Sequence, residues 1–162
     1  MDSMELPGEV AVDEQIEEQK NEKDTVSFLI FSVNEHRLAI EISLVQEIVR
    51  DYKVHFLPFV PEYIEGVINY AGKPYTIVNP CVLDEIKEDS FVEINNPTFL
   101  LFKRDDDQFG LHISMVEIFY EVLKEDLEDE DWENEITYKG RQIPLLKPDK
   151  IEERLLRDLG KI

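Results

Sequence analysis

Apolar residues gather in two pairs of short runs, and each pair is interrupted by a polar turn. The turns are Asn34-Glu35-His36 and Asp105-Asp106-Asp107. Short runs rich in Phe, Ile, Leu and Val that flank a polar turn are typical of β-hairpins. The expected strands are residues 26–33 and 37–42 in the first hairpin and 98–103 and 108–113 in the second.

The two hairpins belong to an internal repeat. With a shift of 71 residues, Phe28-Leu29-Ile30-Phe31 aligns with Phe99-Leu100-Leu101-Phe102, and six of the 18 pairs from residue 28 to 45 are identical. A second block aligns at a shift of 68, matching Tyr70-Ala71-Gly72-Lys73 with Tyr138-Lys139-Gly140-Arg141. Two blocks in the same order favour a duplicated unit over a chance match between apolar hairpins.

Four helical elements are also expected. Ser43 and Ser114 each precede Gln46 or Glu117 by three residues, which is the spacing of a capped helix start. Pro61 and Gly66 suit the first residue and the stop of one short helix. A last helix over residues 150–160 would follow Pro148 and place four apolar residues on one face, namely Ile151, Leu155, Leu156 and Leu159.

These elements predict a mainly β fold with two similar subdomains of about five strands each, at approximately residues 26–90 and 91–150. Units of about 60 residues rarely fold alone without disulfides or metals, so the two should share a core. Residues 1–24 lack aromatic residues and carry a net charge of −7, which indicates a solvated, flexible tail ahead of one domain over residues 25–162.

The formal net charge of the 162-residue chain is −20, which argues against nucleic acid and anionic membrane surfaces as partners. Residues 1–24 and the acidic block 121–135 hold −15 of this charge, so the remainder carries only −5. The first residues do not form a secretory signal, and no apolar run is long enough to span a membrane. The expected location is the cytoplasm, without membrane insertion.

Candidate catalytic chemistry is sparse. Cys81 is the single cysteine and is interpreted as a small apolar residue, while His112 alternates with apolar neighbours and is expected at the surface. No nucleophile or phosphate-binding motif occurs, so no enzyme activity, cofactor or metal is predicted. Asp105–Asp107 and Glu128–Asp131 could hold a hard cation, but a solvated loop is the default interpretation. Trp132 could anchor the second acidic loop by packing.

Several motifs together resemble the CheW family of bacterial chemotaxis coupling proteins. They are Val45-Gln46-Glu47-Ile48, the spaced Pro58 and Pro61, Ile64-Glu65-Gly66-Val67-Ile68-Asn69, and Gly72 followed by Ile77-Val78. The resemblance covers about residues 26–156. It implies two linked SH3-like five-stranded β-barrels and a non-catalytic adaptor. The implied partners are the regulatory domain of a CheA-type histidine kinase, chemoreceptor cytoplasmic tips and other CheW-like domains, with recruitment to membrane receptor arrays.

The resemblance also implies a partner-binding groove beside two of these motifs. Its residues here would be Val45, Glu47, Ile48, Gly66, Asn69 and Ala71. Val45 and Ile48 could form an exposed apolar stripe or belong to the core, and Gly66 could simply stop a helix.

One motif departs from the family pattern. Where the family usually has Asn-Leu-Arg-Gly, this chain has Asn69-Tyr70-Ala71-Gly72, and a usual Asp is Asn79. An Arg and an Asp at these two positions could form a charge pair, and both charges are absent here. The loss argues against receptor recognition in the usual manner, although Lys73 could supply a cation.

Two other functions fit the same residues. The chain could be a CheW-like paralogue that builds rings or regulates another system without binding receptors in the usual way. Alternatively, it could be an acidic β-barrel that binds a small ligand or partner mainly through its charge.

Overall fold

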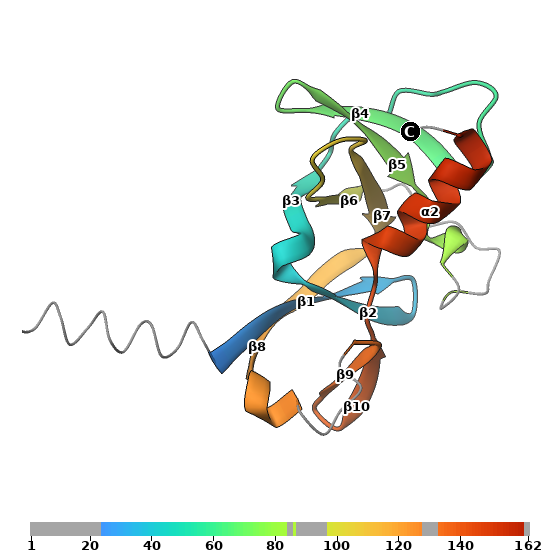
Figure 1. Ribbon diagram of the computed structural model, residues 1–162. Helices are drawn as coiled ribbons and strands as arrows, with labels where there is room; N and C mark the ends of the chain where they lie inside the picture. The colour runs from blue at the N-terminus through green and yellow to red at the C-terminus, as the bar shows by residue number, and fades with distance from the viewer. Residues whose placement is uncertain (1–23, 84–85, 87–96, 128–132, 161–162) are drawn as a thin grey trace, which may run out of the picture.

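The computed structural model describes residues 24–83, 86, 97–127 and 133–160, and these residues form ten strands and one α-helix (Figure 1). The strands of the first half are β1 (Thr25–Val33), β2 (His36–Glu41), β3 (Val45–Arg50), β4 (Ile64–Tyr70) and β5 (Lys73–Val78). Those of the second half are β6 (Thr98–Phe102), β7 (Phe109–Ile113), β8 (Met115–Leu123), β9 (Glu135–Tyr138) and β10 (Arg141–Pro144). Three 3-10 turns, η1 (Ile42–Leu44), η2 (Pro80–Val82) and η3 (Lys124–Leu127), and helix α2 (Pro148–Leu159) complete the described fold.

The strands pair across the two halves of the chain. One sheet has the order β2-β1-β8, and β9 and β10 form a separate pair that joins β2 through a parallel bridge between Ala39 and Leu145. The five-stranded sheet has the order β3-β6-β7-β5-β4, in which β5 and β7 run parallel. Each group therefore contains the first hairpin of one half and the third strand and second hairpin of the other.

The predicted division at residues 26–90 and 91–150 does not match these sheets. The repeat is present, since β1 to β5 and β6 to β10 follow one another in the same pattern, but the repeated halves exchange strands. Hairpins are local and leave a sequence signal, whereas the pairings of β1 with β8 and of β3 with β6 join distant segments that carry none.

Both faces of the central hairpins are buried. Along β1, Leu29 and Phe31 point into one apolar cluster, and Phe28 and Ile30 point into another. Strand β6 also contributes side chains to two clusters. Leu100 packs into the first of the clusters named above, and Phe99 and Leu101 pack into a third. Alternation of side chains along a strand places successive residues on opposite faces. The first cluster is thus shared between the two groups of strands, while each of the others belongs to one group.

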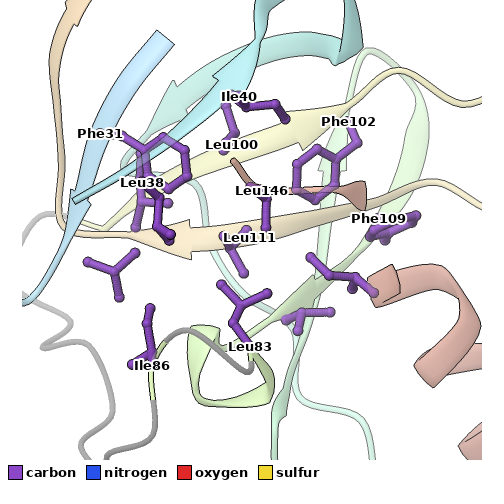
Figure 2. Close-up of a cluster of buried hydrophobic side chains, with 14 of the residues drawn as sticks. Phe31, Leu38, Ile40, Leu83, Ile86, Leu100, Phe102, Phe109, Leu111 and Leu146 are labelled. Carbon is purple, nitrogen blue, oxygen red and sulfur yellow. The ribbon is translucent and has the colours of Figure 1, made fainter. Parts of the chain in front are cut away.

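Figure 2 shows the shared cluster, to which strands from both halves contribute. Its labelled members are Phe31, Leu38, Ile40, Leu83, Ile86, Leu100, Phe102, Phe109, Leu111 and Leu146, and all ten are buried. Full burial of an apolar side chain of this size contributes about 1.5–3 kcal/mol. The expected common core is therefore present.

The turns of the second hairpins explain why that block of the repeat is recognisable. Two residues link β4 to β5 and β9 to β10, and in both turns the pair has positive φ, with Ala71 at 51° and Gly72 at 78° in the first and Lys139 at 49° and Gly140 at 77° in the second. Two consecutive residues with positive φ make a type I′ turn, whose twist matches that of the flanking strands.

Two of the predicted helical elements are wrong. Residues 61–63 form a turn that leads directly into β4 at Ile64, so Gly66 lies within a strand and does not end a helix. Ser43 does lie in the 3-10 turn η1, but Ser114 is in a bend, where its hydroxyl accepts a hydrogen bond from the backbone N–H of Asn34 at 2.8 Å. Ser114 therefore supports the β1–β2 turn.

Helix α2 occupies the predicted C-terminal position and covers the shared core. Ile151 and Leu155 are buried in that core, whereas Leu156, expected on the same face, is exposed. The hydroxyl of Tyr63 donates a hydrogen bond to Asp158 and ties the helix to the start of β4. Burial, followed by this contact with Asp158, raises the pKa of Tyr63 to about 12. The acidic tail before residue 24 and Trp132 lie outside the described residues.

Candidate partner-binding surface

The candidate residues come from two strands at opposite ends of the sheet order. Val45, Glu47 and Ile48 lie in β3, whereas Gly66 and Asn69 lie in β4. The sheet curves so that these two edges approach each other: His55, which follows β3, exchanges backbone hydrogen bonds with Val67 at 2.7 and 2.9 Å. Curvature of this kind closes a five-stranded sheet into a small barrel.

Tyr70 joins the tip of the β4–β5 hairpin to β3. Its hydroxyl donates a hydrogen bond to Glu47 Oε2 at 3.2 Å, and its ring contacts that of Tyr52 with centroids 5.8 Å apart. Desolvation, followed by the charge of Glu47, raises the pKa of the Tyr70 hydroxyl, so the phenol stays protonated and remains a donor at neutral pH. Glu47 and Ala71 thus belong to one surface.

The candidates differ in exposure. Glu47, Asn69 and Ala71 are exposed, whereas Val45 and Ile48 are half-buried and pack against the shared core. The alternatives left open for these two apolar residues are therefore both partly correct: each contributes to the core with one side and leaves the other accessible. We call the accessible faces of Val45, Glu47, Ile48, Asn69 and Ala71 the β3–β4 surface.

Gly66 is buried and has a structural role. A Cβ atom at this position would lie 2.3 Å from the carbonyl oxygen of His55 and 2.8 Å from Cγ1 of Val54. The residue also has a φ of +146°, which side chains disfavour. Glycine is thus required for the close approach of β4 to the segment after β3.

Positions 71 and 79 are too far apart for side chains there to form a charge pair. Ala71 lies in the exposed turn before β5, and Asn79 follows the far end of that strand. The six extended residues of β5 lie between them and span about 20 Å at ~3.3 Å per residue, which is beyond the combined reach of the two side chains. An Arg and an Asp at these positions could not touch, so the predicted loss of a joint charge pair is wrong.

Asn79 instead belongs to a buried polar cluster that sequence patterns missed. His112 is 1% exposed, and its Nδ1 lies 2.9 and 3.0 Å from the two carboxylate oxygens of Glu65. Asn79 donates from its amide to Glu65 at 3.1 Å and accepts from the backbone N–H of Cys81. The cluster joins β4, β7 and η2.

The expectation that His112 is at the surface is wrong. Strand β7 has both faces covered, so alternation along it does not separate buried from exposed positions. Cys81 is half-buried beside this cluster, and burial, followed by the charge of Glu62, raises the pKa of its thiol. A raised thiol pKa lowers the reactive thiolate population and agrees with the interpretation as an apolar residue.

Exposed aromatic residues near this surface were also missed. Phe56 is 82% exposed and Phe59 is fully exposed, and both lie in the loop that leads from β3 to β4. Phe59 has a φ of 59°, an uncommon conformation for a bulky residue. The closely spaced prolines Pro58 and Pro61 were the available signal, because they exclude regular pairing around them.

Among the described residues, His, Cys, Asp and Glu side chains do not come together in a group of three that could hold a metal ion. Within the same residues, no helix is long and apolar enough to cross a membrane.

Comparison with known proteins identifies the class. The model of the CheW-like domain family matches residues 27–153, so this chain belongs to that family. Its fold is accordingly that of two SH3-like β subdomains with a C-terminal helix, as the resemblance implied. A comparison with curated proteins returns no match.

A solved structure agrees with this assignment. The chain is similar to the scaffolding protein TtCheW from Thermoanaerobacter tengcongensis, with a TM-score of 0.63 and 19% sequence identity. The alignment covers 75% of this chain and 88% of the other. At this identity the likeness establishes a common fold.

Replacing Gly66 tests whether this position supports the fold or touches a partner. Gly66→Ala is expected to lower the free energy of unfolding by about 2–4 kcal/mol, because the methyl group overlaps backbone and the φ is strained. Gly72→Ala is the matched control: its Cβ meets nothing within 4 Å, so only the left-handed backbone costs about 1 kcal/mol. Urea unfolding measures both, and equal losses would contradict this role for Gly66.

Proposed function

We propose that this chain is a non-catalytic signalling adaptor of bacterial chemotaxis, which couples chemoreceptors to a CheA-type histidine kinase. Membership of the CheW-like domain family over residues 27–153 is the observation that carries the proposal. The similar solved structure is described as a scaffolding protein, which supports a role in assembly. The adaptor would act in the cytoplasm at receptor arrays.

The β3–β4 surface is the proposed docking site. It combines accessible sides of Val45 and Ile48 with the Glu47 carboxylate and the exposed amide of Asn69. Apolar contacts supply affinity, and a few polar groups select the partner. Phe56 and Phe59, in the loop that connects β3 to β4, offer large exposed apolar side chains to a partner pocket.

Glu47 is suited to specify the partner because its environment is already organised. Tyr70 donates to one carboxylate oxygen, and the backbone N–H of Ile48 donates to the other at 3.1 Å. The two bonds hold the carboxylate in place while leaving it exposed, so less rotamer entropy is lost when a cation binds.

Charge reversal at Glu47 tests the surface directly. Glu47→Lys is expected to weaken binding to a CheA-type kinase regulatory domain by at least about tenfold, because a central charge contact becomes repulsive. Glu125→Lys, which makes the same change at an exposed position in η3, should change affinity by less than about twofold. Isothermal titration calorimetry measures both dissociation constants.

Two results would contradict the proposal. The first is an absence of binding to both the kinase regulatory domain and a receptor tip fragment at ~100 μM, since even weak specific complexes form in this range. The second is equal weakening by the two charge reversals, which would indicate general electrostatic attraction rather than a defined surface.

A substitution at Ala71 can distinguish two functions of this chain. One is the coupling adaptor, and the other is a paralogue that assembles with CheW-like domains but does not bind receptors. The exposed turn that holds Ala71 lies beside Glu47 and lacks the Arg of the usual motif. Ala71→Arg adds a cation without new backbone strain, because Ala and Arg tolerate the φ of 51° equally.

The variant has different expected results for the two functions. For a coupling adaptor that has lost this contact, Ala71→Arg should strengthen binding of a receptor tip fragment by about tenfold in fluorescence anisotropy, whereas Ala71→Glu should not. Receptor binding that is absent both before and after the substitution, with intact kinase binding, would favour the paralogue and overturn the receptor half of the proposal.

A further inference from the structure

Helix α2 carries a stripe of cations beside a cleft. Lys150, Arg154 and Arg157 follow one another at spacings of four and three residues, which place them on one face of the helix, and Lys147 precedes them. The cleft has a volume of about 350 Å³ and lies between α2 and the segment around η2. Its apolar lining consists of Val82, Leu83, Leu146 and Ile151.

The acidic residues of its own helix neutralise the stripe only in part, through an ion pair between Asp158 and Arg154. Asp149 and Glu152 lie 2.9 and 3.2 Å from Arg104, outside the cleft lining. Asp158 accepts from Tyr63 and lies 3.5 Å from Arg154. Glu153 is the acidic residue among those that line the cleft.

The four cations that line the cleft differ in how far they are already engaged. Lys147 donates to the side chain of Asn134 at 3.0 Å, and Arg154 lies over the ring of Tyr63. The hydrogen bond from Tyr63, followed by the charges of Arg154 and Arg157, lowers the pKa of Asp158, so both arginines also interact with this carboxylate. Within the part of the chain that the structure describes, Lys150 forms no ion pair. The cleft therefore presents a net positive charge in a protein whose formal net charge is −20.

The size and chemistry of the cleft decide among possible anionic ligands. From Lys147 to Arg157 the stripe extends about 15 Å at ~1.5 Å per residue, which is longer than a single phosphate or carboxylate can span. Nucleic acid and anionic lipid surfaces would meet the repulsion of the whole molecule at long range. A peptide with a few carboxylates carries less negative charge than nucleic acid or an anionic lipid surface, so the rest of the molecule repels it less. Its apolar side chains would cover the apolar lining of the cleft.

We propose that this cleft is a docking site for an acidic peptide segment of a partner protein, with carboxylates on Lys150, Arg154 and Arg157 and apolar side chains against Leu83 and Ile151. The site is distinct from the β3–β4 surface, since the residues that line the cleft include none of that surface. The proposal goes beyond the coupling function by giving the protein a second face for another partner.

A designed probe tests the site. The full chain, labelled with ¹⁵N, is titrated with a 12-residue peptide of alternating Glu and Leu or Ser, and amide shifts are followed by NMR. The largest shifts are expected at residues 147–157 and 82–83. Raising NaCl from about 50 to 300 mM should weaken binding by about tenfold, because exposed charge contacts are screened at this ionic strength.

A matched pair of double variants distinguishes the cleft from general attraction. Lys150→Glu with Arg157→Glu should weaken binding of the probe by at least about tenfold. Lys73→Glu with Arg141→Glu produces the same net charge at two exposed positions elsewhere and should change affinity by less than about twofold. Thermal unfolding of both variants establishes that each is folded before affinities are compared.

The outcomes separate the possible occupants. Equal weakening by the two double variants, or shifts that map away from α2, would overturn the proposal. Salt-dependent shifts of the same amides without any probe would show that an acidic segment of this chain fills the cleft, and would also overturn it. Failure of the cleft would leave the kinase-binding test at Glu47 unaffected, because Glu47 does not line the cleft.

Discussion

The pairing of β1 with β8 and of β3 with β6 is the constraint on which the rest of the structure depends. Each pair joins strands from different halves of the chain, so neither half can complete its own barrel. The central hairpins have apolar side chains on both faces and need cover on both. The exchange of strands provides this cover. One face of each central hairpin fills the interior of a barrel, and the other face belongs to the core that both barrels share.

This arrangement explains how a small β protein can present stable binding surfaces. Strands β3 and β4 are edges, yet Gly66 allows them to approach closely, and Tyr70 links the hairpin tip to Glu47. Behind them, Glu65 and His112 connect β4 to β7 in the interior. Exposed groups such as Glu47 are therefore held by a frame that is largely independent of them, which favours specific binding without a large ordering cost.

Local features were predictable from the sequence. Both first hairpins, the glycine turns of the second hairpins and helix α2 have signals that lie within a few residues of one another. The exchange of strands had no such signal, because a repeat gives the order of elements but not which copy each one pairs with. His112 was misplaced for a related reason: alternation predicts exposure only when one face of a strand meets solvent.

The candidate site was predictable in part. The family resemblance selected Glu47 and Asn69, which are exposed, together with Gly66, whose importance is steric. It could not indicate Phe59 or the cation stripe of α2, because exposure and clustering of charge are properties of the folded chain. The charge of −20 described the whole molecule, yet the cleft beside α2 is locally positive.

Cutting the chain between residues 90 and 91 tests the exchanged architecture most directly. The two fragments are prepared separately and mixed, and urea unfolding is followed by circular dichroism. If the halves exchange strands, neither fragment alone should show a cooperative transition, and an equimolar mixture should regain one as a 1:1 complex. Cooperative unfolding of either fragment alone would contradict the account.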